Sequence, residues 1–416
     1  MVSARSLTVQ LQRSTGDWVD VGDLHSEHQK NWFKLRESYW NLANRPVLGQ
    51  IFEERGPVWK PNAHVALPHW FSHLLPEGLL REAVSDAAHI SSAREFELLS
   101  RLGGTDLPGA IRAVPSSAPP SVDVPSNRLP AEPISTEGDD PLLKFSLAGV
   151  QLKFSVYGSS RGLTVPAQGQ AGNFILKLPD GRPGFSGVPE AELGSLELAR
   201  SVGIETPEAF LVSPADVAGL EEWAARAPGS ALAVRRLDRR ENGNRVHMEE
   251  IAQVMDIPTG RGTAKYTRAN FETIAVLVEA LCGTAAVGDV IDRLVLNVLV
   301  GNGDAHLKNW AISYPDGRLP VLSPVYDVVP TVLYIPKDDL GLNLSRSKSF
   351  EAVTTGSFDY IGSRTGYGIP AARQRARDAT ARVLANWTVL RDYLSRDAFD
   401  KLSDRLRTLP LVAEGD

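Results

Sequence analysis

The sequence contains a single cysteine, Cys282, among 416 residues. The chain therefore cannot form an internal disulfide or a zinc site built from several cysteines, and the apolar surroundings of Cys282 favour a place in the core. No run of 18 apolar residues occurs, and the first ten residues (MVSARSLTVQ) lack the apolar region of a signal peptide. We therefore expect a cytoplasmic protein with no contact to a membrane.

Two further absences narrow the possible functions. Neither a Walker A sequence nor a G-x-G-x-x-G motif is present, which excludes two common phosphate-binding loops. The formal net charge is −6, and this argues against a broad DNA-binding surface on the chain itself. The length allows two or three domains, and the content of 43% hydrophobic and 23% charged residues is ordinary for a globular protein.

Residues 1–113 form the first predicted unit. Apolar and polar residues alternate from Leu7 to Gln12, which predicts a half-buried strand, and residues 18–19 fit its hairpin partner. His69 and His73 lie four residues apart, a spacing that could suit a metal on a helix. No carboxylate or third histidine is in helical register with them, so we interpret both as surface histidines.

A proline-rich segment, residues 114–141, follows. Its Pro, Ser, Ala and Asp content, with few large apolar residues, is typical of an extended linker. Residues 142–238 then change to short strands with one helix, which opens at Pro189 and ends at Gly203. The order is strand, glycine turn, strand, strand with a lysine, helix with acids, and two strands. Protein-kinase small lobes have this order.

Several groups in residues 142–238 fit nucleotide binding. Gly149 can let the backbone approach phosphates closely, although most single glycines only turn the chain. Lys177 lies between apolar neighbours and could simply point to solvent. Glu192 on the next helix could instead pair with Lys177 and hold it against the phosphates of a nucleotide. The sequence Arg235-Arg-Leu-Asp238 would connect the two lobes, with its backbone facing an adenine.

The chain is organised around residues 292–329. There an apolar helix breaks at Gly301-Asn302-Gly303, a polar loop follows, and a short hairpin leads to Asp327. Asp304 and Asn309 are five positions apart. Protein kinases place a catalytic Asp and a metal-binding Asn at this interval, and a second metal-binding Asp after a hairpin. The alternative is that these are ordinary loop and cap residues, since the pattern is short and no HRD or DFG triplet is present.

The remainder of the chain, residues 239–416, is predicted to be mainly helical. One expected helix covers residues 246–255, with Ile251, Val254 and Met255 on one face. Residues 342–348 are polar and basic; they could lie near a substrate entrance or form an ordinary solvated loop.

Together these pieces resemble the HipA family of bacterial serine/threonine kinases, the toxins of toxin–antitoxin pairs. The resemblance covers most of the chain and rests on FSLAGVQLKFSV (145–156), NFILKLP (173–179), PEAELGSLELARSVGIETPEA (189–209), ALAVRRLDRR (231–240), VHMEEIAQVMDIP (246–258), NGDAHLKNWAI (302–312) and YDVVPT (326–331). WFSHLLPEG (70–78) and FELLSRLG (96–103) extend it into the first unit.

The resemblance implies a fold, a reaction and partners. The fold would be α+β and two-lobed, like that of protein kinases, with an additional N-terminal α+β subdomain and a mainly helical C-terminal lobe. ATP and magnesium (Mg²⁺) would serve the transfer of the γ-phosphate to a protein hydroxyl, and family substrates include aminoacyl-tRNA synthetases. A HipB-like antitoxin with a helix-turn-helix would supply the DNA contact that this acidic chain lacks.

The resemblance also assigns roles to single positions. It makes Asp304 the catalytic base, Asn309 and Asp327 the magnesium ligands, and Glu192 the partner of the lysine. The implied ATP-binding residues are Gly149, Val150, Gln151, Lys177, Arg235, Leu237, Asp238 and His306. Ser146 matches the serine that family members autophosphorylate, and a phosphate there is expected to switch the enzyme off.

Two departures from the family pattern affect details. Arg235 stands where an acidic residue is common, which could alter side-chain contacts to the adenine. Some members have two serines before the glycine loop, whereas this chain has Lys144 and Ser146, which limits regulation to one site.

Two other classes of function stay open. A small-molecule phosphotransferase could use the same fold, but it would not require an N-terminal unit of about a hundred residues. A catalytically inactive module could dock an antitoxin, but the intact set of Lys177, Asp304, Asn309 and Asp327 argues against that.

Overall fold

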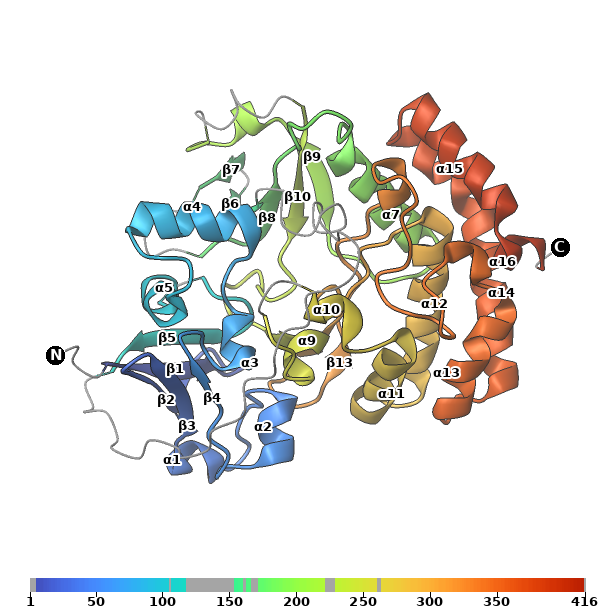
Figure 1. Ribbon diagram of the computed structural model, residues 1–416. Helices are drawn as coiled ribbons and strands as arrows, with labels where there is room; N and C mark the ends of the chain where they lie inside the picture. Colours follow the sequence, from blue (N-terminus) through green and yellow to red (C-terminus); the bar gives the residue numbers. More distant parts are fainter. Residues whose placement is uncertain are drawn as a thin grey trace.

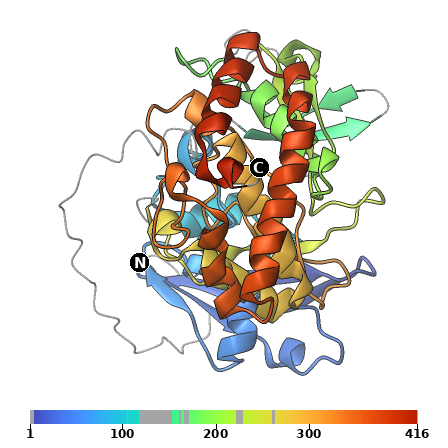
Figure 2. The same ribbon diagram turned by 90° about the vertical axis from the view of Figure 1, so that its right-hand side faces the viewer.

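The computed structural model describes residues 5–104, 106–116, 153–159, 162–165, 171–220, 229–259 and 263–414. These ranges form an N-terminal sheet domain, a small lobe and a large helical lobe (Figure 1). In Figure 2 the N-terminal sheet (blue) lies at the bottom, the small lobe (green) at the top, and the C-terminal helices (red) run over the face turned to the viewer. Ser146, Gly149, Val150 and Gln151, like most of the expected linker, lie outside the described residues, so the expectations for them stay predictions.

Five antiparallel strands form the N-terminal sheet in the order β4-β3-β2-β1-β5. They are β1 (Arg5–Gln12), β2 (Trp18–Glu27), β3 (Lys30–Leu35), β4 (Asn62–His64) and β5 (Ile111–Pro115). The predicted alternation is confirmed in β1, where Leu7, Val9 and Leu11 are buried, and β2 is its hairpin partner. Successive side chains of a strand point to opposite faces, so this alternation leaves one face for a core.

Short helices cover this sheet and give the domain a hydrophobic core of its own. They are α1 (Glu37–Trp40), α2 (Gln50–Arg55), α3 (His69–Ser72), α4 (Gly78–Ala88) and α5 (Glu95–Leu102). Aromatic rings fill the centre, with ring centroids 4.7 Å apart for Phe33 and Phe71 and 5.5 Å apart for Phe52 and Trp70. Such ring pairs add stabilisation beyond the buried area alone.

The small lobe is a second antiparallel sheet, in the order β7-β6-β8-β10-β9. Its strands are β6 (Lys153–Ser159), β7 (Gly162–Thr164), β8 (Phe174–Lys177), β9 (Ala209–Val212) and β10 (Ala231–Arg235), and its helix is α7 (Val188–Ser201). Helix α7 begins with Pro189 in its first turn, as predicted. The lobe therefore has the strand and helix order that the sequence indicated. A short 3₁₀ turn, η2 (Pro214–Asp216), follows β9.

The large lobe is helical around a three-stranded sheet, β11-β12-β13. Its strands are β11 (His247–Glu250), β12 (Ala311–Tyr314) and β13 (Val321–Leu322). Its helices are α9 (Ile251–Val254), α10 (Ala264–Thr267), α11 (Phe271–Cys282), α12 (Ala285–Val300), α13 (Asp359–Arg364), α14 (Ile369–Asn386), α15 (Arg396–Thr408) and α16 (Pro410–Ala413), with 3₁₀ turns η3 (Thr331–Leu333), η4 (Phe350–Ala352), η5 (Thr355–Phe358) and η6 (Trp387–Asp392). Nearly every residue of α12 is buried, so this helix is a fixed support for the loop that follows it.

One prediction for the large lobe is wrong. The helix expected over residues 246–255 is instead strand β11 followed by the single helical turn α9. Strand β11 pairs with β12, with His247 opposite Tyr314 and Glu250 opposite Ala311. This long-range pairing overrides the local helical spacing, because ladder hydrogen bonds to a strand sixty residues away are invisible in the segment itself.

Candidate active site

One large pocket opens where the N-terminal domain, the small lobe and the large lobe meet. Its volume is about 650 Å³, within the range of small-molecule sites in proteins. The N-terminal domain contributes apolar side chains such as Leu74 and Leu107. Every site residue that the sequence suggested and the structure describes lies in its wall: Lys177, Glu192, Arg235, Leu237, Asp238, Asp304, His306, Asn309 and Asp327.

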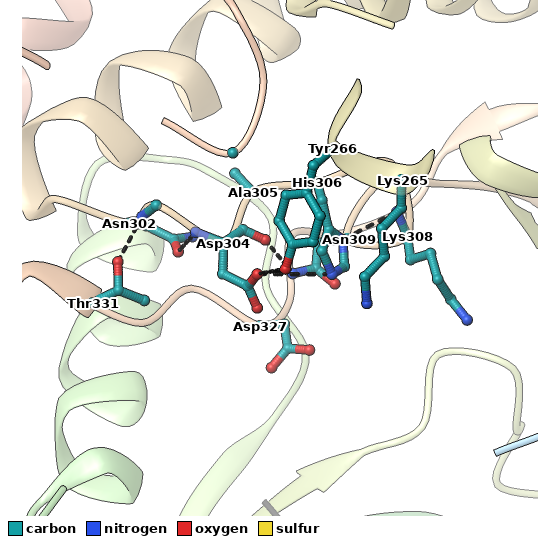
Figure 3. Close-up of polar contacts among 12 residues, drawn as sticks. Lys265, Tyr266, Asn302, Asp304, Ala305, His306, Lys308, Asn309, Asp327 and Thr331 are labelled. Atoms are coloured by element: carbon teal, nitrogen blue, oxygen red, sulfur yellow. Dashed lines mark hydrogen bonds and ion pairs between the residues drawn. The ribbon is translucent and has the colours of Figure 1, made fainter. Parts of the chain in front are cut away.

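The loop that carries Asp304 is held in shape by amide side chains (Figure 3). Helix α12 ends at Gly301, whose φ of +75° is a left-handed conformation that glycine adopts without strain. The Asn302 side chain donates to Asn297 Oδ1 (2.8 Å) and accepts from the Asp304 N–H (3.0 Å). Asn309 Nδ2 donates to the Asp304 carbonyl oxygen (2.8 Å). The interval of five residues thus closes a loop that fixes Asp304 relative to Asn309.

The Asp304 carboxyl group is buried among polar neighbours. The Tyr266 O–H donates to its Oδ1, and His306 Nε2 lies 3.8 Å from the same oxygen. Burial raises the pKa of Asp304 to about 7, although the charge of Lys265 and the Tyr266 hydrogen bond oppose this shift. Burial also lowers the pKa of His306 well below its usual value, so His306 is neutral at pH 7. A carboxyl group with a pKa near neutrality suits proton transfer.

Lys177 on β8 joins the two lobes through its amine. Its Nζ lies 2.5 Å from Glu192 Oε1 on α7 and 2.5 Å from Asp327 Oδ1 in the large lobe. Burial alone would lower the pKa of Lys177, but the two carboxylates outweigh burial and raise it, so the amine stays charged. The structure therefore brings together the lysine and the helix acid that the sequence suggested as a pair.

Asp327 also contacts a second lysine, which the sequence analysis missed. Its Oδ2 lies 3.0 Å from the Nζ of Lys153 at the start of β6. Burial would raise the pKa of Asp327, but Lys153 and Lys177 together lower it. In Figure 3 the Asp327 side chain lies beneath the loop on the side of the Asp304 carboxylate, and the charges of the two acids influence each other. The sequence offered a signal for Lys153, because it comes only four residues after Gly149, the glycine suggested to lie near the phosphates.

In the segment between the lobes, the side chain of Asp238 is paired with other protein groups of the described structure, whereas the main-chain N–H of Leu237 is not. The Asp238 carboxylate accepts hydrogen bonds from Arg236 and from Arg239, and from the N–H of Gly109 in the N-terminal domain (2.7 Å). Its pKa is lowered because the arginines outweigh burial. Among the residues that the structure describes, no acceptor takes the Leu237 N–H. The expectation that the main chain of this segment faces an adenine stays a prediction.

Arg235 turns its side chain along the surface of the small lobe. Its Nε donates to Glu208 Oε2 (2.6 Å), and its guanidinium lies 4.7 Å from the ring centroid of Phe174. The arginine that departs from the family pattern is thus paired within its own lobe, where it lines the pocket.

Glu77, Lys265 and Lys308 are among the further charged residues of the pocket wall that were missed. Lys265 and Lys308 both contact Glu77, which belongs to the N-terminal domain. The sequence separations are 188 and 231 residues, so no local pattern could have predicted these contacts.

His69 and His73, the pair with helical spacing, both contact the large lobe. His69 Nδ1 lies 3.1 Å from the Asp256 carbonyl oxygen, and His73 Nε2 lies 2.8 Å from the Ile257 carbonyl oxygen. His73 is buried, so its interpretation as a surface histidine is wrong. Burial and the charge of Lys308 lower the pKa of His73 to about 3. It is therefore a neutral histidine that joins two units.

The basic segment at residues 342–348 packs beneath the loop that carries Asp304. Leu342 and Leu344 are buried. Lys348 Nζ donates to the carbonyl oxygens of Gly341 (3.0 Å) and Tyr266 (3.2 Å). Lys348 is thus bound to main-chain oxygens, and the expectation that the segment lies near a substrate entrance stays a prediction.

A magnesium ion would find two suitable oxygen ligands here. Asn309 and Asp327 offer an amide and a carboxylate oxygen, the hard donors that Mg²⁺ prefers. Within the described ranges, no three His, Cys, Asp or Glu side chains gather as a metal-binding cluster, so water and phosphate oxygens would complete the shell. No helix in the described part of the chain is long and apolar enough to cross a membrane.

Two family descriptions match the chain. Residues 145–387 match the HipA-like C-terminal domain, and residues 16–114 match the HipA N-terminal domain. The putative kinase Y4dM of Sinorhizobium fredii is 38% identical over 384 residues, which cover 90% of each chain. A second putative kinase of that organism, Y4mE, is 30% identical over 391 residues, 88% of this chain and 86% of the relative.

More distant relatives extend the similarity to toxins. The serine/threonine-protein kinase toxin HipA of Shewanella oneidensis is 22% identical over 406 residues, 89% of this chain and 86% of the toxin. A solved structure of HipA with HipB and its operator DNA, from Shewanella oneidensis MR-1, superposes with a TM-score of 0.71 at 18% identity and covers 98% of this chain and 96% of that one. At this identity the superposition shows the fold, a two-lobed α+β kinase fold with an N-terminal sheet domain.

Proposed function

Because the chain belongs to the HipA family of kinases, we propose that it is a serine/threonine protein kinase that transfers the γ-phosphate of ATP to a protein hydroxyl. One observation carries the proposal. Asp304, Asn309 and Asp327, at kinase spacing, share a pocket with the ion-paired Lys177 and Glu192. Phosphoryl transfer is catalysed mainly by such positioning and by charge.

Asp304 is the base in this proposal. Its carboxylate receives the proton of the acceptor hydroxyl while the hydroxyl oxygen bonds to the γ-phosphorus and ADP leaves. The Tyr266 hydrogen bond and the Asn309 contact to the Asp304 main chain hold the carboxyl group in place. A positioned general base contributes about 10²–10⁴ in rate.

Lys177 and the magnesium ligands account for the charge of the triphosphate. The Lys177 amine, kept charged by Glu192, would turn from Asp327 to the phosphates. Asn309 and Asp327 would hold Mg²⁺, which neutralises the phosphates when bound. The neutral His306 could donate a hydrogen bond to a phosphate oxygen without adding charge.

The adenine would lie at the segment between the lobes. The Leu237 N–H is available there as a donor, and Leu107, Ile175 and Val234 offer apolar contacts in the same part of the pocket wall. The expected contribution of Gly149, Val150 and Gln151 to the phosphates belongs to the proposal as well.

The biological setting follows from the relatives. We place the kinase in the cytoplasm, with a HipB-like helix-turn-helix antitoxin as its partner, and DNA contacted through that antitoxin. The protein substrate would be an aminoacyl-tRNA synthetase or another translation component. Autophosphorylation at Ser146 would add about −1.5 to −2 charges beside the triphosphate and switch the enzyme off.

The deciding experiment incubates the purified chain with Mg-ATP labelled at the γ-phosphate, together with a bacterial lysate, and identifies labelled proteins by mass spectrometry. Wild-type protein should label a serine or threonine of a translation component and its own Ser146, and Asp304→Asn should label neither while remaining folded by circular dichroism. Label on small molecules alone would favour a small-molecule phosphotransferase. No label with intact Mg-ATP binding would favour an inactive antitoxin-docking module.

A further inference from the structure

A compact group of charges connects the N-terminal domain with the loop that carries Asp304. Glu77 lies in the turn just before α4, and its two carboxylate oxygens contact two different lysines. Oε1 lies 2.8 Å from Lys308 Nζ, and Oε2 lies 3.1 Å from Lys265 Nζ. Lys308 also lies 3.4 Å from Glu250 Oε2 on β11. A single carboxylate of one domain thus bridges two cations of another.

Both lysines are attached to the active-site loop by their main chains. Lys308 stands directly before Asn309, and its carbonyl oxygen accepts from the Tyr326 O–H (2.9 Å), next to Asp327. Lys265 accepts at its carbonyl oxygen from the Leu307 N–H (3.2 Å). Figure 3 shows the side chains of Lys265, on α10, and of Lys308, on the loop, pointing in the same direction. Holding both amines therefore restrains the loop at Leu307 and at Lys308.

Glu77 is the acid of this group that is ionised at neutral pH. Burial would raise the pKa of Glu77, but Lys308 and Lys265 outweigh burial and lower it. Burial raises the pKa of Glu250 to about 7, so near neutral pH Glu250 carries less of the negative charge than Glu77. The side chains of Lys265 and Lys308 are 8% and 12% exposed, and two nearby buried cations repel each other unless a carboxylate separates them.

We propose that Glu77 is a positioning residue for phosphoryl transfer: by bridging Lys265 and Lys308, the N-terminal domain fixes the loop in which Asp304 and Asn309 must be aligned. This inference rests on the proposed kinase function and adds that the N-terminal domain completes the active site. Glu77 itself need not touch the nucleotide. Its effect would pass through the lysines to the geometry of the loop, where small displacements of reacting groups reduce rates strongly.

The alternative is an ion pair that only joins two domains. The chain offers a matched control in the same domain, because Glu53 contacts Arg45 through both oxygens (2.5 and 2.6 Å) and does not line the pocket. Glu53→Gln removes the same charge and breaks a similar pair. A purely structural role for Glu77 predicts that both substitutions have similar consequences.

The test uses the full-length chain with Glu77→Gln, Glu77→Asp, Lys308→Met, the double variant Glu77→Gln/Lys308→Met, and Glu53→Gln. For each we would measure kcat and KM for γ-phosphate transfer, the Kd for Mg-ADP by calorimetry, and thermal unfolding. We expect kcat of Glu77→Gln to fall about 10- to 100-fold, with the Kd for Mg-ADP within about twofold of wild type. Glu77→Asp should recover part of the loss.

The double variant separates a joint effect from independent ones. If Glu77 acts through Lys308, the double variant should lose little more activity than either single variant, because interacting residues are not additive. Glu53→Gln should retain wild-type kcat. Should Glu77→Gln fail to fold, Glu77→Asp and Lys308→Met carry the same comparison.

Two results would overturn the role of Glu77. One is a kcat of Glu77→Gln within twofold of an active wild type; the other is a loss that appears equally in Mg-ADP binding and thermal stability, with no recovery in Glu77→Asp. A wild type that binds Mg-ADP but transfers no phosphate would instead refute the kinase function, and with it the inference built on it.

Discussion

The large lobe meets its two neighbours through junctions of different kinds. Towards the N-terminal domain, Glu249 accepts hydrogen bonds from Trp70 (3.1 Å), from the Gln50 N–H (2.9 Å) and from Tyr314 (2.5 Å). Towards the small lobe at the pocket, Asp327 is held by Lys177 and Lys153. At the first junction, protein groups occupy both carboxylate oxygens of Glu249. The second uses groups whose partners a metal ion and phosphates would replace.

The difference follows from where hydrophobic cores lie. The N-terminal domain has a core of its own, and a buried acid at its junction with the large lobe needs hydrogen-bond partners to be stable. At the pocket, Glu192 Oε2 is a buried atom with no hydrogen-bond partner in the described structure, and so are His73 Nδ1 and His247 Nδ1 at the junction with the N-terminal domain. The two sides therefore differ in the groups that hold their acids: neutral donors hold Glu249, whereas lysines hold Asp327 where Mg²⁺ and phosphates would bind.

The largest expected effect lies in the segment between the lobes, where Asp238 also contacts the N-terminal domain. Asp238→Asn removes the carboxylate shared by Arg236, Arg239 and the Gly109 N–H and leaves buried arginines short of a counter-charge. We expect the free energy of unfolding to fall by about 3 kcal/mol, since breaking a buried pair costs about 3–5 kcal/mol and Asp106 still contacts both arginines. Urea unfolding measures it.

A surface pair provides the control for Asp238. Asp359→Asn breaks an ion pair with the exposed Arg373 and should cost much less stability, because solvent screens exposed pairs. If both variants lose the same stability, the ion pairs of Asp238 contribute no more to the fold than an exposed pair does.

The second prediction is a pH dependence of stability at the junction between the N-terminal domain and the large lobe. Burial raises the pKa of Glu249 to about 7, above its value of about 4.5 in an unfolded chain. A raised pKa means that this acid stabilises the fold fully below pH 4.5 and that the contribution is lost as pH rises to about 7, on the order of 3 kcal/mol. Glu249→Gln stays neutral, so its stability relative to wild type should rise between pH 5 and 8.

Thermal unfolding of wild type and Glu249→Gln across that pH range isolates this residue, because other groups titrate in both proteins. A constant difference between the two curves would show that Glu249 keeps an ordinary pKa and that the junction is insensitive to pH.

The same contrast explains what the sequence could predict. Lys177, Glu192, Asp304, Asn309 and Asp327 could be found because each lies within a local pattern: a strand lysine, a helix acid, an interval of five, a hairpin. Their common pocket follows from the two-lobed fold that these patterns indicate.

The N-terminal junction could not be found in this way. Trp70 and Glu249 are 179 residues apart, and Glu77 and Lys308 are 231 residues apart. The error at residues 246–255 has the same origin, since β11 is a strand only because β12 lies beside it. Contacts that depend on tertiary placement leave no periodic signal in either partner.

The third prediction concerns the junction at the pocket, where Lys177 joins the small lobe to Asp327 of the large lobe. Lys177→Met removes the amine that Asp327 and Glu192 share, and we expect the affinity for Mg-ATP to fall about 10- to 100-fold, as for the loss of one or two charge-assisted hydrogen bonds. Without magnesium, wild-type affinity should also be weak, because lysine and metal neutralise the same triphosphate. Calorimetry with Mg-ATP and with ATP plus chelator measures both; equal affinities in the three cases would remove lysine and metal from the site.

The smallest expected effect belongs to Lys153, the outer partner of Asp327. Its side chain is 36% exposed and lies 3.0 Å from Asp327 Oδ2, so the pair is worth only about 0.2–1 kcal/mol. A magnesium ion that binds Asp327 must displace this contact. Lys153→Met should therefore lower the Mg²⁺ concentration for half-maximal activity by about two- to fivefold, the factor that corresponds to such an energy, with the rate at saturating Mg²⁺ nearly unchanged.

Lys34→Met, on the exposed face of β3, removes the same charge far from the pocket and should leave the Mg²⁺ dependence as it is. If Lys153→Met needs as much Mg²⁺ as wild type, Lys153 does not compete with the metal for Asp327, and the binding of Mg²⁺ does not require the loss of this contact.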